Sequence, residues 1–366
     1  GMKRRTVLAA GAGLLAFPAM AKPRSLRVAL LGQALIEHVV SEDAWPGRKA
    51  LRARLRGADV CFTNLETVIR GNRAGTPTRE SLTVHAGEAR VLGVLDDLGV
   101  NLVATSNNHA FDLGSGGILD TIDALRGQGL VWAGSGSDLS AAAAPGYRQV
   151  PGGAVALVAF ATGKIREGGA ATASRPGVNE LRRRPSGEPA AEDLARVLAS
   201  IREARRTSQV VIAYQHNHDW EPALEDVPAW QRDLARLCID AGASAFVGHG
   251  APVLQGAEVY KGPPLLYGLG NFVIQTEKPP GAYPPSAWTS VFAECVFEGG
   301  RLTSLRFEPI VLNEVGRGGP ADMETRGFPR LAEAGERKAI LEGFAKSSAK
   351  LGGALRLRPD GQVVAL

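Results

Sequence analysis

The sequence predicts an α/β fold, in which strands and helices alternate along one large domain. Apolar runs of strand length recur between longer segments whose apolar residues follow helical spacing. The later part of the chain changes character, because strand-like segments flank Gly299-Gly300 and predict a hairpin. No internal repeat is present, and 366 residues are enough for a large hydrophobic core even as one domain.

Short apolar runs predict the strands, and longer amphipathic segments predict the helices. The expected strands are residues 26–31, 60–63, 102–105, 154–161, 210–214, 245–247, 265–267 and 290–297, and the expected helices are residues 87–98, 117–126, 190–206 and 227–241. Residues 162–189 are rich in Gly, Pro, Ala and Arg without a period, and predict a long loop that either covers the site or is mobile. Residues 313–330 predict a similar connector, and residues 330–350 a surface helix.

The first 21 residues predict a signal peptide of the twin-arginine type. Arg4 and Arg5 precede a run of Ala, Leu and Gly, and small residues stand before Lys22. The protein is therefore expected to be exported to the periplasm or cell envelope, with an uncleaved membrane anchor as the alternative. Removal of this segment lowers the formal charge from +5 to +2, because it holds three basic residues and no acidic residue. No dense Lys/Arg stripe remains, which argues against nucleic acid as a partner.

The segment from Ser106 to Gly114 is the most informative part of the chain. It places Asn108, His109 and Asp112 directly after the apolar run 102–105, at the kind of strand end where α/β sheets hold their functional groups. An Asn side chain is a neutral oxygen ligand, and an adjacent His donates a proton or a hydrogen bond to a bound anion. The pair therefore suits metal-assisted hydrolysis. The alternative is a turn that favours Asn and Asp on backbone grounds alone.

Further polar side chains follow other predicted strands. Four of the six histidines of the chain stand at or just after apolar runs. Such side chains meet only if their strands lie side by side, and that convergence is the working hypothesis. The residues at these strand ends are Asn64, Glu66, His216, His218, His249 and Asn271. By contrast, His38 and His85 lack such a context, and we expect both to lie on the surface.

The order of these blocks resembles the capsule-synthesis protein CapA family, which is linked to poly-γ-glutamate and belongs to the calcineurin-like metallophosphatase superfamily. The resemblance covers residues 26–309. It rests on five blocks: Leu31-Gly32-Gln33, Asn64-Leu65-Glu66, Asn107-Asn108-His109 with Asp112 and Gly114, the His216 block, and Gly248-His249 followed by Leu269-Gly270-Asn271-Phe272. It implies a metallophosphatase-like sandwich of two mixed β-sheets flanked by helices. The family domain would span residues 22–312, and residues 313–366 would form a connector and a helix packed on it.

The resemblance also implies a set of site residues. Glu66, Asn108, His216 and His249 would bind a metal ion, with His109 beside it as acid or anion donor. Strand alternation points His218 to the same face as His216, but the position of His216 matches the single His of the family. Gln33, Asn64, Asp112, His218 and Asn271 would form additional parts of the pocket.

Two departures from the family pattern affect the metal site. Gln33 stands where members normally have Asp, and Pro252 stands where a second late His is expected. Both changes remove ligands of the same ion, so the resemblance implies one divalent ion, Mn, Zn or Fe, or none. In another alignment the late pair falls on Gly250 and Pro252, which leaves His249 one residue out of phase.

Three functions remain open from the sequence. The first is a metal-dependent hydrolase of the cell envelope, acting on a phosphoester or on an amide of an anionic polymer such as poly-γ-glutamate. The second is a non-catalytic protein that binds such a polymer and assists capsule synthesis or export. The third is a structural partner of a membrane synthase. Glu66 and His109 favour the first function, while Gln33 and Pro252 favour the second.

Overall fold

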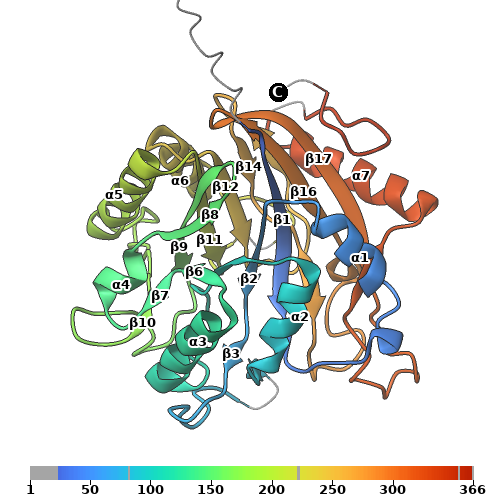
Figure 1. Ribbon diagram of the computed structural model, residues 1–366, viewed down its shortest axis with the longest axis horizontal. Helices are drawn as coiled ribbons and strands as arrows, with labels where there is room; N and C mark the ends of the chain where they lie inside the picture. The colour runs from blue at the N-terminus through green and yellow to red at the C-terminus, as the bar shows by residue number, and fades with distance from the viewer. Residues whose placement is uncertain (1–23, 81–82, 221–222, 353–354, 365–366) are drawn as a thin grey trace, which may run out of the picture.

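Two β-sheets pack face to face at the centre of the molecule, and helices cover their outer faces (Figure 1). The computed structural model describes residues 24–80, 83–220, 223–352 and 355–364. The predicted signal peptide, residues 1–21, lies outside the described residues.

The larger sheet has eight strands in the order β18-β17-β16-β1-β2-β5-β6, and β15 also pairs with β1. Its central strand β1 is parallel to β2 and β15 but antiparallel to β16, so the sheet is mixed. Its strands are β1 (Leu26–Leu35), β2 (Val60–Leu65), β5 (Leu102–Ala104), β6 (Val131–Ala133), β15 (Asn271–Ile274), β16 (Thr289–Glu298), β17 (Arg301–Leu312) and β18 (Pro329–Leu331).

The second sheet has six strands in the order β13-β14-β12-β11-β9-β8. Its four inner strands are parallel and its two edge strands are antiparallel to their neighbours. These strands are β8 (Gly146–Val150), β9 (Gly153–Thr162), β11 (Val210–Asn217), β12 (Ala245–His249), β13 (Ala257–Val259) and β14 (Pro264–Leu266). Two further pairs are short: β3 (Val68–Ile69) with β4 (Ala86–Gly87), and β7 (Ser135–Gly136) with β10 (Gly177–Val178).

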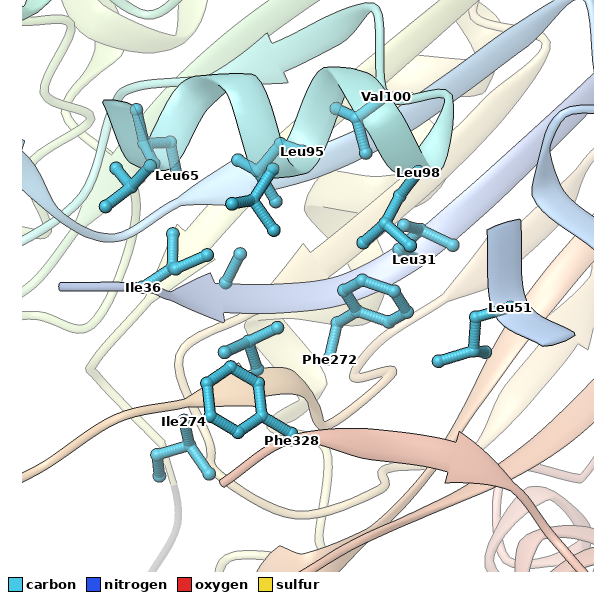
Figure 2. Packing of buried hydrophobic residues seen from close by; sticks show 14 of the residues in the cluster. Leu31, Ile36, Leu51, Leu65, Leu95, Leu98, Val100, Phe272, Ile274 and Phe328 are labelled. Carbon is cyan, nitrogen blue, oxygen red and sulfur yellow. The ribbon is translucent and has the colours of Figure 1, made fainter. Parts of the chain in front are cut away.

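Alternation along β1 explains how the layers are held together. Val28 and Leu30 belong to the apolar cluster between the sheets, whereas Ala29 and Leu31 belong to the cluster on the outer face. Figure 2 shows that outer cluster, in which Leu31 lies near Leu98 and Leu51 of the covering helices. Both faces of β1 are therefore buried, which is why its sequence is almost continuously apolar.

Helices pack on the outer face of each sheet, and the C-terminal helix packs against β17. α1 (Arg48–Leu55) and α2 (Arg90–Leu98) contribute to the outer cluster of the larger sheet, and α5 (Ala191–Thr207) and α6 (Ala229–Asp240) to that of the smaller sheet. α7 (Ala334–Ala349) packs Phe344 against Phe307 of β17, with ring centroids 4.7 Å apart. Among the described residues, the structure also has α3 (Gly114–Gln128), α4 (Leu139–Ala143) and the 3-10 turns Glu42–Ala44 and Pro285–Trp288.

The predicted sandwich of two mixed sheets with flanking helices is confirmed, with differences in detail. Sequence analysis does not predict α1, and it includes Gly87 in a helix although this residue pairs in β4. The expected long loop 162–189 contains the short strand β10, and the expected connector 313–330 runs into the edge strand β18. Within the described part of the chain, no helix combines the length and the apolar character needed to span a bilayer.

Candidate metal-binding and catalytic site

The candidate site lies where strands of both sheets end. In the larger sheet Gln33 is in register with Asn64 of β2 and with Asn271 of β15. In the smaller sheet His216 of β11 is in register with His249 of β12. Glu66 follows β2, and the Asn107-Asn108-His109 turn follows β5. The expected convergence of the strand ends is therefore present.

A cavity of about 400 Å³ opens at this place. Its lining includes Glu66, Asn108, His109 and His218, together with Gln33, Pro252 and Asn271. His216 and His249 are not among the lining residues, and they are 0% and 2% exposed.

Glu66, His216 and His218 bring their potential ligand atoms within 4.8 Å of one another. Glu66 Oε1 lies 3.4 Å from Nε2 of His216, and the same nitrogen lies 2.9 Å from Asn108 Oδ1. Glu66 Oε2 and both ring nitrogens of His218 are buried without a hydrogen-bond partner among the described residues. Because unpaired buried polar atoms are costly, these atoms fit a divalent ion as their common partner. A carboxylate, two imidazoles and an amide oxygen suit Zn, Mn or Fe.

The protonation of these groups also suits metal binding. Burial by itself raises the pKa of Glu66, but His216 and His109 outweigh it, and the pKa lies below its ordinary value. Burial lowers the pKa of His218 well below its ordinary value, with His216 adding to the effect. Burial likewise lowers the pKa of His249 to about 3. Metal ions bind neutral imidazoles, which is the form that these shifts favour for His218 and His249.

His249 lies outside the group formed by Glu66, His216 and His218. Its ring centroid is 5.3 Å from that of Tyr214, and neither ring nitrogen has a hydrogen-bond partner among the described residues. His218, which the sequence places second to His216, instead joins His216 in that group.

His109 is oriented by Asp112. Its Nδ1 lies 2.8 Å from Asp112 Oδ2, and its Nε2 lies 3.9 Å from Glu66 Oε1. Burial, with a smaller effect of His85, holds the pKa of His109 well below its ordinary value. Burial also raises the pKa of Asp112 to about 6, although Arg79 opposes that shift. The contact with Asp112 places the proton on Nδ1, so Nε2 is left to face Glu66.

Asn64 and Asn107 act as supports behind these groups. Asn64 Nδ2 lies 3.4 Å from His216 Nδ1, and Asn64 Oδ1 accepts from Asn107 Nδ2 at 3.0 Å. Asn107 Oδ1 in turn accepts from the backbone N–H of His109 at 3.1 Å. The amides therefore connect the His216 and His109 sides of the site through buried hydrogen bonds.

Gln33 and Asn271 form a buried amide network where the family resemblance implies a second ion. Gln33 Nε2 donates to Asn271 Oδ1 at 2.9 Å, and Gln33 Oε1 accepts from the N–H of Gly250 at 3.1 Å. Asn271 Nδ2 donates to the carbonyls of Pro252 at 3.1 Å and Ala287 at 3.0 Å. Both ends of the Gln33 amide are thus engaged within the protein.

The expectation that His85 is a surface residue is wrong. Its side chain is buried and lines the cavity, and its ring centroid is 4.4 Å from that of His109. The short pairing of Val68 with Ala86 causes this placement, because it returns the loop after Glu66 to the site. His38 is half-buried and its Nε2 contacts the carbonyl of Glu324 at 2.8 Å.

Arg79 is a second site residue that sequence analysis did not identify. Its Nε lies 2.6 Å from Asp112 Oδ1, and its guanidinium donates to the carbonyl of Asn108 at 2.5 Å. Its segment, residues 70–85, has no periodic pattern that would mark it, so only the β3–β4 pairing reveals its position.

Comparison with known proteins identifies the family. Residues 27–276 match the family model described as "Bacterial capsule synthesis protein PGA_cap". The chain belongs to this family. The PGA biosynthesis protein CapA of Bacillus subtilis is 35% identical over 50% of this chain and 44% of its own length. A probable polyglutamine synthesis accessory protein of Mycobacterium tuberculosis is 34% identical over 64% of this chain and 60% of its own length.

Two other similarities extend over more of the chain. The uncharacterized protein y4sH of Sinorhizobium fredii is 27% identical over 88% of this chain and 89% of its own length. Among solved structures, a 5'-nucleotidase precursor from Thermus thermophilus is 15% identical, with a TM-score of 0.42, and the match covers 90% of this chain and 60% of that chain.

Proposed function

We propose that this PGA_cap family member is an exported, metal-dependent hydrolase of envelope polymer metabolism with a site for one ion. The observation that carries the proposal is the meeting of Glu66, His216 and His218 beside a cavity, with Glu66 Oε2 and both nitrogens of His218 unpaired among the described residues. Buried groups of this kind are retained at a cost to stability, which points to a role in binding.

Glu66, Asn108 and His216 would bind the ion, and His218 and His249 are the two candidates for the remaining imidazole ligand. When bound, a divalent ion supplies Lewis acidity and lowers the pKa of a coordinated water. We infer a single ion because Gln33, Asn271 and the Gly250 N–H satisfy one another where further ligands would be needed. A Gln amide also lacks the charge that keeps two dications together.

His109 would move the proton that hydrolysis requires. Asp112 holds its Nδ1–H, which leaves Nε2 to accept a proton from the attacking water or to return one to the leaving group. The 3.9 Å separation from Glu66 keeps that nitrogen next to the proposed ion-binding group.

The family and the charge of the cavity support an anionic substrate. Among the described residues that line the cavity, Arg79, Lys164 and Lys278 are basic and Glu66 is acidic. Such a lining favours an anionic substrate, either a poly-γ-glutamate-like polymer or a phosphoester. The Bacillus subtilis relative is named for PGA biosynthesis, and the Mycobacterium tuberculosis relative is named as a probable accessory protein of polyglutamine synthesis. The proposal accordingly places the protein in the periplasm or cell envelope, with a membrane synthase as a partner.

The test is hydrolysis by ion-loaded protein. Poly-γ-glutamate and bis(p-nitrophenyl) phosphate serve as the amide and phosphodiester substrates, with Mn, Zn or Fe supplied. The His109→Gln variant should lower the rate by about 100-fold to 10,000-fold while ion content stays constant. His38→Gln is the matched control, since that ring contacts a distant carbonyl. Equal rates for His109→Gln and the wild type would contradict the proposed role.

A non-catalytic polymer-binding protein is the second candidate. The Gln33–Asn271 network favours it, because these amides occupy the place of a second ion. Binding of poly-γ-glutamate without hydrolysis of either substrate, in protein shown to contain the ion, would select this function.

A further inference from the structure

One wall of the cavity carries two basic side chains that belong to no expected ligand or catalytic group. Arg79 and His85 both line the cavity, next to His109. They come from the segment that the β3–β4 pairing returns to the site. Each of the two side chains is held in place by a neighbouring carboxylate, Arg79 by Asp112 and His85 by Glu37.

Arg79 is held in place from behind. Its side chain is 10% exposed, and its partners among the described residues are the Asp112 carboxylate and the Asn108 carbonyl. A guanidinium carries five N–H donors, so these two partners leave donors available to a ligand in the cavity. Burial of a charged group is costly unless it is paired. Asp112 pairs it only in part, because the same carboxylate also accepts from the backbone N–H of His85 and contacts His109 Nδ1.

His85 is oriented by Glu37. Its Nδ1 contacts Glu37 Oε1, and its side chain is 4% exposed. With Nδ1 engaged, Nε2 is the atom that His85 can offer to the cavity. When both ring nitrogens carry a proton, Nδ1–H donates to Glu37 and Nε2–H is a donor for a bound anion.

We propose that Arg79 and His85 form an oxyanion subsite that selects substrates with a carboxylate or phosphate group beside the bond to be cleaved. The inference rests on the proposed function and specifies its substrate. Arg79 would bind the oxyanion through its free N–H groups and His85 through Nε2–H, while Glu37 acts as a positioning residue. Asp112 ties Arg79 and the His85 backbone to His109, so the bound anion would stand next to the group that moves the proton.

The charges of the cavity agree with this role. Besides Arg79, the basic residues Lys164 and Lys278 line the cavity, and the lining described by the structure holds one carboxylate, that of Glu66. A divalent ion bound at Glu66 would make the cavity more positive still. An anionic ligand would then gain both from direct hydrogen bonds and from the surrounding field.

Binding measured by calorimetry tests the proposal without any need for turnover. The ligands are tri-γ-glutamate, its counterpart in which every α-carboxylate is a carboxamide, and inorganic phosphate, each added to ion-loaded protein. Wild-type protein should bind the charged trimer at least tenfold more tightly than the carboxamide. Arg79→Gln and His85→Gln should each weaken binding of the anion by about tenfold to 100-fold and remove this preference. If only phosphate binding depends on the two residues, the subsite selects phosphoesters.

Matched variants separate recognition from folding. Arg90→Gln changes an exposed Arg, and His38→Gln changes a His whose Nε2 contacts the carbonyl of Glu324; both should leave binding unchanged. Glu37→Gln should weaken binding through His85, so the Glu37→Gln, His85→Gln double variant should bind no worse than His85→Gln alone. Glu37 is half-buried, so we expect Glu37→Gln to fold. This variant therefore still tests the subsite if Arg79→Gln fails to fold.

The outcomes also separate this inference from the proposed hydrolase. Folded Arg79→Gln and Glu37→Gln proteins that bind every anion as tightly as the wild type would overturn the subsite, whether or not the wild type hydrolyses a substrate. Arg79-dependent binding in a protein without hydrolysis would retain the subsite and reject the hydrolase.

Discussion

Replacing Gln33 with Met tests whether this residue supports the structure or binds metal. Met has nearly the length of Gln but cannot replace its amide, so the change leaves Asn271 Oδ1 and the N–H of Gly250 without their partner. Each buried group that loses its partner costs about 1–3 kcal/mol, and the apolar side chain recovers a small part of that cost. We therefore expect the free energy of unfolding to fall by about 2–5 kcal/mol.

Urea denaturation followed by tryptophan fluorescence measures that loss, and elemental analysis of the same samples measures ion content. The account expects lower stability with unchanged ion content, because Gln33 is engaged within the protein. Gln128→Met is the control at an exposed Gln, where the change should stay within about 0.5 kcal/mol. A stability loss below about 0.5 kcal/mol in Gln33→Met, or a fall in ion content, refutes the structural role.

Three further predictions concern the ligand set, the C-terminal helix and export. His218→Gln should weaken ion binding by more than about tenfold, because His218 lies in the group with Glu66. His249→Gln should weaken ion binding less. If equilibrium dialysis ranks the two variants the other way, the ligand is His249. Phe344→Ala should lower the free energy of unfolding by about 3–5 kcal/mol, because the ring on α7 is 2% exposed and belongs to the apolar cluster between the sheets. A loss below about 1 kcal/mol in urea denaturation would show that α7 is not integral to the fold. Replacing Arg4 and Arg5 with Lys should keep the precursor in the cytoplasm in a fractionation assay, and unchanged export rejects the twin-arginine route.

Strong local patterns made much of the fold predictable. The apolar runs of β1 and β9 mark strands buried on both faces. The spacing of four residues between Val197 and Ile201, and between Leu234 and Cys238, marks two helices that cover a sheet. Two-residue strands such as β3 and β10 carry no periodicity, so they could not be found this way. In α1, Leu51 and Leu55 have helical spacing, but the other six residues of the helix are basic residues or Ala, so the apolar pattern is too short to recognise.

The candidate site was predictable where a residue follows a strand and not where a loop brings it in. Glu66 and His109 follow the neighbouring parallel strands β2 and β5 of the larger sheet. His216 stands at the end of β11 in the smaller sheet, and the packing of the two sheets brings it to them. Arg79 and His85 reach the cavity only through the pairing of Val68 with Ala86, which is a long-range contact without a local signal. The choice between His218 and His249 also depends on side-chain positions that strand alternation alone does not fix.

The number of ions bound per chain distinguishes a one-ion site from a two-ion site or from no site. Purified protein is loaded separately with Mn, Zn and Fe, freed of loose ions by gel filtration and examined by elemental analysis. The account predicts one tightly bound ion per chain, which is lost in Glu66→Gln because that carboxylate belongs to the group with His216 and His218. Two ions per chain, no ion after loading, or one ion that persists in Glu66→Gln would contradict the account.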